Sequence, residues 1–178
     1  MTRGYIHVTN PAGQGPAGVQ GPTGPAGSSG ISTTASASYW SNQTQGPFTA
    51  NSVQAMTLNN TDWQQGITLQ NSSQIKMTAA GKYNIMFSAQ LEQLNSSGIV
   101  NIWLRKNGTD VPDSNTRVNI AASSPYVVAA WNFFVNSSIN DYYEIMWSSS
   151  SANTILESAT YNTFPKIPSV ILTVNQVG

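Results

Sequence analysis

The sequence predicts an all-β protein: an antiparallel jelly-roll sandwich of about 8–10 strands, preceded by a short collagen-like triple-helical stalk and assembled as a homotrimer. Two observations lead to this prediction. From about Ser36 onward, apolar and polar residues alternate in short runs, which is the period of half-buried strands. Before that point, glycine occupies every third position from Gly15 to Gly30. We therefore expect an N-terminal anchor segment at 1–14, a stalk at 15–30 and a trimeric head at 31–178.

The glycine period is that of a collagen triple helix, in which three chains wind together and every third residue meets an axis where only hydrogen fits. Pro16, Pro22 and Pro25 follow glycine, where the helix already requires the φ angle that proline fixes. A flexible linker with accidental phasing is the alternative. Five triplets are too few to hold three chains alone, so a neighbouring part must trimerise first. The triple-helix glycines are Gly15, Gly18, Gly21, Gly24, Gly27 and Gly30.

The head shows strand signals separated by Ser, Asn, Gly and Pro clusters, at the spacing of a sandwich or barrel, and no long helical pattern. Between Tyr83 and Leu91, alternate residues form one apolar face. Asn107-Gly108 is a strong hairpin signal, because a type I′ turn requires positive φ at both central residues. An immunoglobulin-like sandwich or an up-and-down barrel is the alternative to the jelly roll. The other expected strands are Val53–Leu58, Ile67–Leu69 and Gln74–Thr78, and those in VNIWL, VNI, YVVAAWNFFV, YYEIMW, TILESA and SVILTVNQV.

Three short motifs mark strand ends in the head: GKY at 81–83, RKNG at 105–108 and DYYE at 141–144. With their surroundings they resemble the trimeric jelly-roll domain of the tumour-necrosis-factor and complement-head type. The closer resemblance is to its version in tailed-phage virion fibre proteins and bacterial collagen-like surface proteins, and it covers Tyr39 to Val177. It implies three jelly rolls around one axis with an apolar, aromatic-rich interface, often behind a collagen-like stalk.

Charge and composition exclude several classes of partner. Of the 178 residues only 8% are charged and the net charge is zero, so the Lys/Arg patch that nucleic acid binding requires is missing. The absence of cysteine excludes disulfides and thiolate metal sites. The N-terminus lacks the apolar run of a secretory signal, and no run is long enough to insert into a membrane. We expect synthesis in a host cytoplasm and a location in the virion.

The residues available for catalysis argue against an enzyme. The one histidine, His7, precedes the stalk, so the head has no histidine base or ligand. Asp110 and Asp113 could bind Ca²⁺ with loop carbonyls, but a solvated hairpin loop accounts for them better. Asp141 and Glu144 are three apart in a strand and therefore lie on opposite faces. We expect no catalytic residue, cofactor or metal site.

Binding residues are expected in loops, since strands fix the frame and loops can vary. Amide, hydroxyl and aromatic groups suit a polysaccharide better than a charged ligand. Trp63 is surrounded by polar residues and turn formers, so it is the best candidate to stack on a sugar; Trp103, Trp131 and Trp147 fit core or trimer packing. The candidate receptor contacts are Trp63, Asn95, Asp110, Asp113, Asn115, Tyr126, Asn153 and Tyr161.

The order of anchor, stalk and head predicts a phage fibre or spike. In this hypothesis a homotrimer binds another virion protein through residues 1–14 and presents its head to a host-surface glycan. A capsid decoration or head-fibre protein with a structural role is the second hypothesis. A bacterial or spore surface filament is the third, and the short stalk weakens it, since such filaments carry long repeats.

Overall fold

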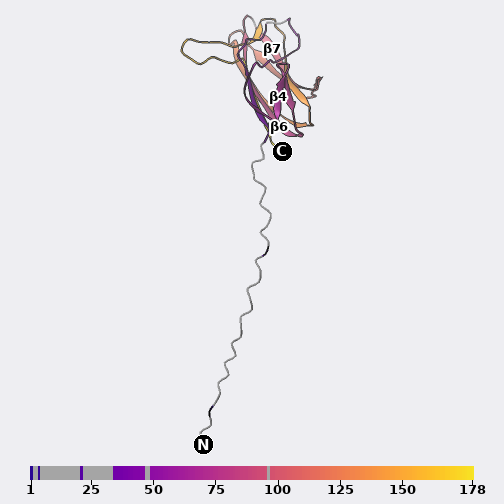
Figure 1. Ribbon diagram of the computed structural model, residues 1–178. Helices are drawn as coiled ribbons and strands as arrows, with labels where there is room; N and C mark the ends of the chain where they lie inside the picture. Colours follow the sequence, from indigo (N-terminus) through magenta and orange to yellow (C-terminus); the bar gives the residue numbers. More distant parts are fainter. Residues whose placement is uncertain (2–3, 5–20, 22–33, 47–48, 96) are drawn as a thin grey trace. The chain divides into compact units, whose positions relative to one another are not determined.

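The computed structural model describes residues 34–46, 49–95 and 97–178, together with Met1, Gly4 and Gly21 (Figure 1). The chain divides into two units, Met1–Ser32 and Thr33–Gly178, and the second unit is the head. The predicted anchor segment (1–14) and stalk (15–30), apart from Met1, Gly4 and Gly21, lie outside the described residues.

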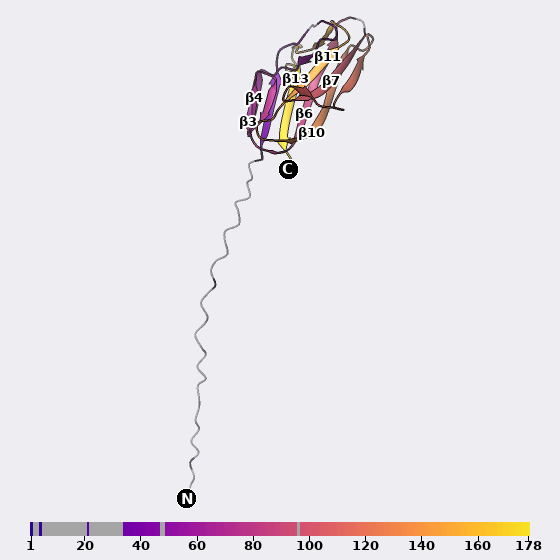
Figure 2. The same ribbon diagram turned by 90° about the vertical axis from the view of Figure 1, so that its right-hand side faces the viewer.

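The head is built from two antiparallel sheets, as predicted, and its described residues contain no helix. Sheet A has the order β10-β6-β13-β1-β3, with β12 also paired to β6; Figure 2 shows β3, β13, β6 and β10 side by side across one layer. Its strands are β1 (Ser36–Ser41), β3 (Asn60–Gln65), β6 (Gly81–Gln93), β10 (Tyr126–Ser137), β12 (Thr154–Leu156) and β13 (Val170–Gln176).

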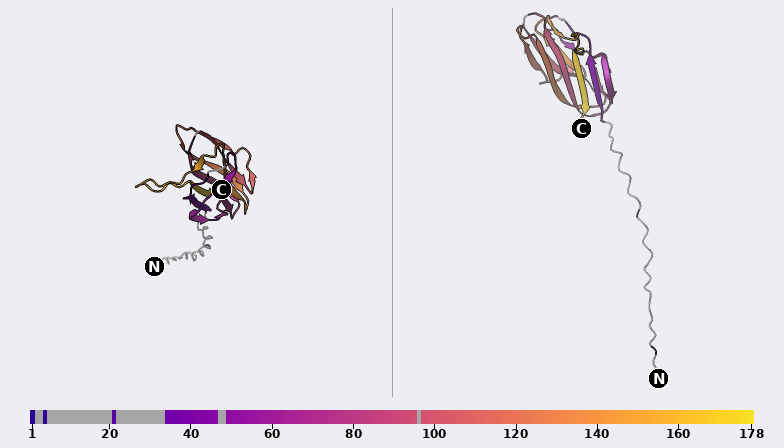
Figure 3. Two further views of the ribbon diagram at one scale, coloured as in Figure 1. Left: turned by 90° about the horizontal axis from the view of Figure 1, so that it is seen from above. Right: turned by 90° about the vertical axis from the view of Figure 1, so that its left-hand side faces the viewer.

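Sheet B has the order β4-β5-β11-β7-β8, with β2 paired to β11 and β9 paired to β7. It forms the second layer of the sandwich; Figure 3 shows the head from above and from the side opposite to that of Figure 2. The strands are β2 (Gln54–Ala55), β4 (Ile67–Gln70), β5 (Gln74–Met77), β7 (Gly98–Lys106), β8 (Thr109–Asp110), β9 (Thr116–Ile120) and β11 (Tyr142–Ser149).

The core lies between the inner faces of the two sheets. Along β6 the buried positions alternate from Tyr83 to Leu91, as the apolar period predicts. Strand β7 contributes Val100, Ile102 and Leu104 in the same way from sheet B. Because successive strands cross between the sheets, for example from β6 to β7, one core holds segments that are far apart in the chain. The outer face of each sheet remains open to solvent or partners.

Two turns depend on residues that tolerate positive φ. Asn107 and Gly108 have φ of 50° and 81° and join β7 to β8, which confirms the predicted hairpin. Gly66 separates β3 from β4 with φ of 65°, and a Cβ there would lie 2.8 Å from the Cβ of Ala35. Only glycine fits at position 66 without strain.

The strand predictions are wrong in three places. Strand β3 contains Trp63 in a run of polar residues and turn formers; it lies at the edge of sheet A, where no alternation of apolar residues is needed. The predicted strand Val53–Leu58 shortens to β2, because only two of its residues pair with β11. The described head also has 13 strands, more than expected, since three are only two or three residues long: β2, β8 and β12.

Candidate functional site

The outer face of sheet A carries exposed apolar side chains. Strand β10 presents Tyr126, Val128 and Phe134, which are 58%, 56% and 71% exposed. Ile171 of β13 and Trp63 of β3 are exposed on the same face. Such a concentration on one face is typical of a surface that associates with a partner.

The centre of this face is uncharged. Cross-strand register places Trp40, Ile171, Ser88 and Ala130 in one row across four strands. Beyond this row, the side chain of Asn132 donates to Asn84 at 2.9 Å. The charged residues of the described sheet A strands are Asp62, Lys82 and Glu92.

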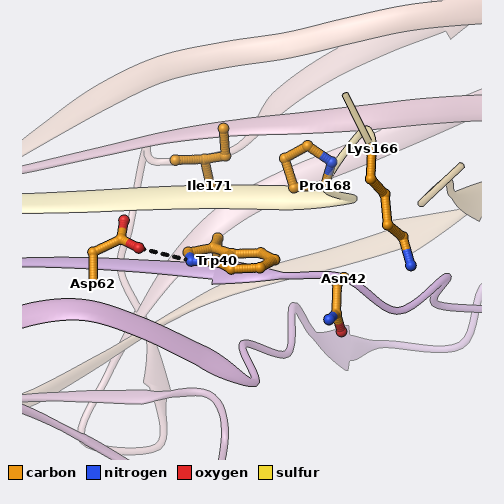
Figure 4. Close-up of a pocket in the computed structure, with 6 residues that line it drawn as sticks. All are labelled: Trp40, Asn42, Asp62, Lys166, Pro168 and Ile171. Carbon is orange, nitrogen blue, oxygen red and sulfur yellow. Dashed lines mark hydrogen bonds between the residues drawn. The ribbon is translucent and has the colours of Figure 1, made fainter. Parts of the chain in front are cut away.

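A cavity of about 300 Å³ opens on this face around Trp40 (Figure 4). Figure 4 shows Ile171 and Pro168 along one side of the indole ring and Lys166 beyond the end opposite Asp62. The indole N–H donates to Asp62 at 2.9 Å, and Asp62 also accepts from Ser38 at 2.9 Å. These bonds fix the ring, so the cavity has a rigid apolar floor.

A larger cavity of about 460 Å³, here called the sheet B pocket, lies on the outer face of sheet B. Outward positions of β7 alternate with the core positions Val100, Ile102 and Leu104, and Trp103 is one of the outward residues. Val53 and Val111 add apolar surface. The polar groups and the indole of the pocket come from Asn101, Trp103, Asp110, Asp113, Asn115 and Ser148.

Charge within the sheet B pocket is negative. Arg105 Nε donates to Asp110 Oδ1 at 2.7 Å and holds the pKa of that carboxyl below its usual range. The buried Trp103 N–H has no partner within hydrogen-bond distance among the described residues. No lysine or arginine side chain of the described residues lines the pocket, so its two carboxylates disfavour an anionic ligand.

The loop that forms one wall of the sheet B pocket is held to β7. Ser114 Oγ donates to the carbonyl of Val111 at 2.7 Å and accepts from the backbone N–H of Leu104 at 3.1 Å. The backbone N–H of Val111 donates to the Leu104 carbonyl at 2.9 Å. The wall is therefore formed without a ligand, which reduces the ordering cost of binding.

A third group of candidate residues, two tyrosines and two glutamates, lies where β10 begins. Tyr161 donates to Glu157 at 2.8 Å, and this bond raises the pKa of the tyrosine to about 12. The charge of Glu92 raises the pKa of Tyr126. Tyr161 belongs to the connection between β12 and β13, which protrudes from the sandwich in Figure 1, and Phe164 on it is 73% exposed.

An ion pair joins the last residue of β7 to the residue before β11. Lys106 Nζ lies 2.7 Å from Asp141 Oδ2, and Asp141 also accepts from Asn107 at 2.7 Å and from the backbone N–H of Ser138 at 2.7 Å. Lys106, and then the other donors, lower the pKa of Asp141 to about 2. These three partners hold the carboxylate in one position.

The structure groups the predicted receptor contacts into separate places. It brings Asp110, Asp113 and Asn115 together in the sheet B pocket and places Tyr126 and Tyr161 around Glu92 and Glu157. Asn95 and Asn153 lie near each other: the backbone of Leu94 bonds to Asn153, and Gln93 bonds to Asn95. Trp63 stands apart on β3, where its indole N–H lies 3.4 Å from the hydroxyl of Ser36.

Of the tryptophans expected to serve packing, Trp147 is fully buried, and Trp131 packs edge-on against Phe87 with ring centroids 4.7 Å apart. Trp103 lies outside the core and lines the sheet B pocket, so of the two expected packing roles only the trimer contact stays a prediction. Sequence reasoning also missed Asn101 and Ser148, although a tryptophan on the polar side of an alternating strand is a signal that points to this pocket. Among the described residues, no three His, Asp or Glu side chains gather as a metal site would require. That described part also has no helix of a length and apolarity able to cross a membrane.

Comparison with known proteins identifies the fold. No family model and no curated protein matches the sequence. The structure is similar to crystal structures of murine APRIL, a protein of the tumour-necrosis-factor family, at pH 8.5 (TM-score 0.52, 9% identity) and at pH 5.0 (TM-score 0.51, 7% identity). Each match covers 81% of this chain and 99% of the other. The globular domain of zebrafish complement 1qA protein matches with a TM-score of 0.49 and 10% identity, over 82% of this chain and 98% of the other. From the APRIL comparison, the head has the jelly-roll fold of the tumour-necrosis-factor type.

Proposed function

We propose that the protein is a homotrimeric structural and adhesive virion protein of a phage, a fibre or spike that presents its head to a host-surface glycan. Residues 1–14 anchor it to another virion protein, and residues 15–30 form a collagen-like stalk. The observation that carries the proposal is a Gly-X-Y repeat immediately before a jelly-roll head with one apolar sheet face.

The outer face of sheet A is the surface that joins the three heads in this proposal. It holds Val128, Phe134 and Ile171 exposed in a molecule with few charges, and its central rows are uncharged. Burying these side chains removes apolar area from water, which favours association. Three heads joined in this way bring three chains together at the N-terminal side, as a short triple helix requires.

Attachment rather than catalysis is the role that we propose for the head. Asp141 is occupied by Lys106 and Asn107, and Glu144 accepts from Ser73 at 2.7 Å, so these two carboxylates have structural partners. The polar outer face of sheet B and the loops stay available for a receptor. The proposal needs no cofactor, nucleic acid or membrane insertion, and it places the protein in the virion after synthesis in the host cytoplasm.

Mass and location together test this function. Light scattering on the full chain should give the mass of three chains, and immunogold labelling with antibody against the head should mark tail tips. The purified trimer should also bind host cells. A monomer, or a trimer that ignores host cells, contradicts the proposal. Label scattered over the capsid with unchanged infectivity after head deletion favours the decoration role instead, and polysaccharide cleavage by the head contradicts the absence of catalysis.

A further inference from the structure

We infer that the sheet B pocket binds one ring of a neutral saccharide. The inference deepens the proposed function, because it rests on glycan attachment and assigns that role to a specific site. The volume of about 460 Å³ is within the range of small-molecule sites, roughly 300–1,000 Å³. The pocket lies on the sheet that the proposed trimer leaves open, so three copies are accessible in each assembly.

Trp103 supplies the apolar surface that a sugar ring needs. The faces of a pyranose ring carry C–H groups, which pack against a flat aromatic side chain, and a tryptophan provides a large one. Val53 and Val111 extend this surface. The indole N–H is buried, so the ring is the part of Trp103 that a ligand in the pocket meets.

The polar groups of the pocket match hydroxyl groups. Asn115 Nδ2 donates to Asn101 Oδ1 at 3.3 Å. This bond leaves the side-chain NH2 of Asn101 as a donor and the side-chain carbonyl oxygen of Asn115 as an acceptor for a ligand. Asp113 lines the pocket, and its carboxylate can accept from two hydroxyls. The pocket therefore offers both donors and acceptors beside its apolar surface.

The negative charge of the pocket favours a neutral saccharide over an acidic one. Asp110 and Asp113 line the pocket and no cationic side chain of the described residues does, so a sialylated, uronic or phosphate-bearing polymer would meet repulsion there. Arg105 reaches Asp110 from outside the lining and neutralises part of its charge, which also weakens attraction for a cation. A neutral hexose or N-acetylhexosamine unit fits this balance best.

The experiment titrates the full-chain trimer with maltotriose, cellotriose and chitotriose, with sialyllactose and trigalacturonate as acidic probes and spermine as a cationic probe. At least one neutral trisaccharide should bind by calorimetry and change tryptophan fluorescence. Trp103→Ala should weaken that binding at least about tenfold. Asn101→Ala combined with Asn115→Ala should weaken it similarly, which keeps the test valid if the tryptophan variant unfolds.

The matched control is Asn119→Ala, which removes an exposed amide from β9 of the same sheet outside the pocket and should bind as the wild type does. Binding of no neutral saccharide, equal binding by the pocket variants, or preference for an acidic probe or spermine overturns the inference. The proposed function fails separately, through the mass, labelling and host-cell results. If the pocket variants still bind host cells, the proposed attachment function stands, and only the assignment of attachment to this pocket is wrong.

Discussion

The outer faces of the two sheets differ in what they offer to other molecules. The strands of sheet A hold five exposed large apolar residues, whereas Ile99 is the single one in the described strands of sheet B. Sheet B carries twice as many charged residues in its described strands, six against three. It also has the larger cavity, while sheet A has a face whose central rows are uncharged. In the proposed function, the two faces thus separate association with copies of the chain from recognition of a ligand.

The largest expected effect comes from placing a charge on the apolar face. Val128→Asp introduces a carboxylate that would be buried without a partner between heads, and such burial costs several kcal/mol. We expect light scattering to show monomeric heads at micromolar concentration. Ile99→Asp is the control on sheet B and should leave the mass at three chains. Equal behaviour of the two variants would remove the distinction between the faces.

Substitutions at inward positions should lower the free energy of unfolding but leave the trimer intact. Ile85 of sheet A and Ile102 of sheet B are fully buried in the shared core. Either change to Ala removes buried methyl groups and leaves a cavity, so the free energy of unfolding should fall by about 2–5 kcal/mol. Chemical denaturation measures this loss, and light scattering at low denaturant should still give a trimer. A loss confined to one of the two variants would mean that the sheets do not unfold as one unit.

Low pH should lower the free energy of unfolding by weakening the Lys106–Asp141 ion pair of sheet B. The pKa of Asp141 is about 2 in the fold against an ordinary value of 3.8, so its stabilisation is complete above the ordinary value and lost as the pH falls towards 2. Since Lys106 is about a third exposed, we expect a loss of only about 1 kcal/mol over that interval. Lys106→Met should reduce this acid dependence, because Lys106 is the largest cause of the lowered pKa, while the bonds from Asn107 and Ser138 remain. Lys82→Met on sheet A should preserve it, and the same slope in both variants would contradict the assignment.

Much of the fold follows from the sequence because the apolar period and the turn residues are local. Strand β6 alternates without interruption, and Asn107-Gly108 adopts the positive φ that its turn requires. Strand β3 could not be predicted in this way: it pairs at a sheet edge, where Trp63 and polar neighbours stay exposed. Its pairing with β1 is a tertiary effect that no local pattern contains.

The candidate site is harder to predict because it joins distant segments. Asp113 and Asn115 share one loop and can be grouped from the sequence, but Ser148 arrives from β11 and Val53 from the segment before β2. For Trp103 the sequence favours packing, since a tryptophan in a strand is usually buried. Its outward position depends on the phase of β7, in which Ile102 and Leu104 face the core.

The smallest expected effect sharpens the comparison of the faces. The Arg105–Asp110 pair is exposed, with 54% of the Asp110 side chain accessible, and exposed pairs contribute only about 0.2–1 kcal/mol. Arg105→Gln should therefore barely change the free energy of unfolding, but the pKa of Asp110 should rise, because Arg105 is the main cause of its lowering. Denaturation and an NMR titration of Asp110 measure the two effects. A large loss of stability would mean that the charges of sheet B hold the fold together, whereas a raised pKa with intact stability assigns them to the pocket.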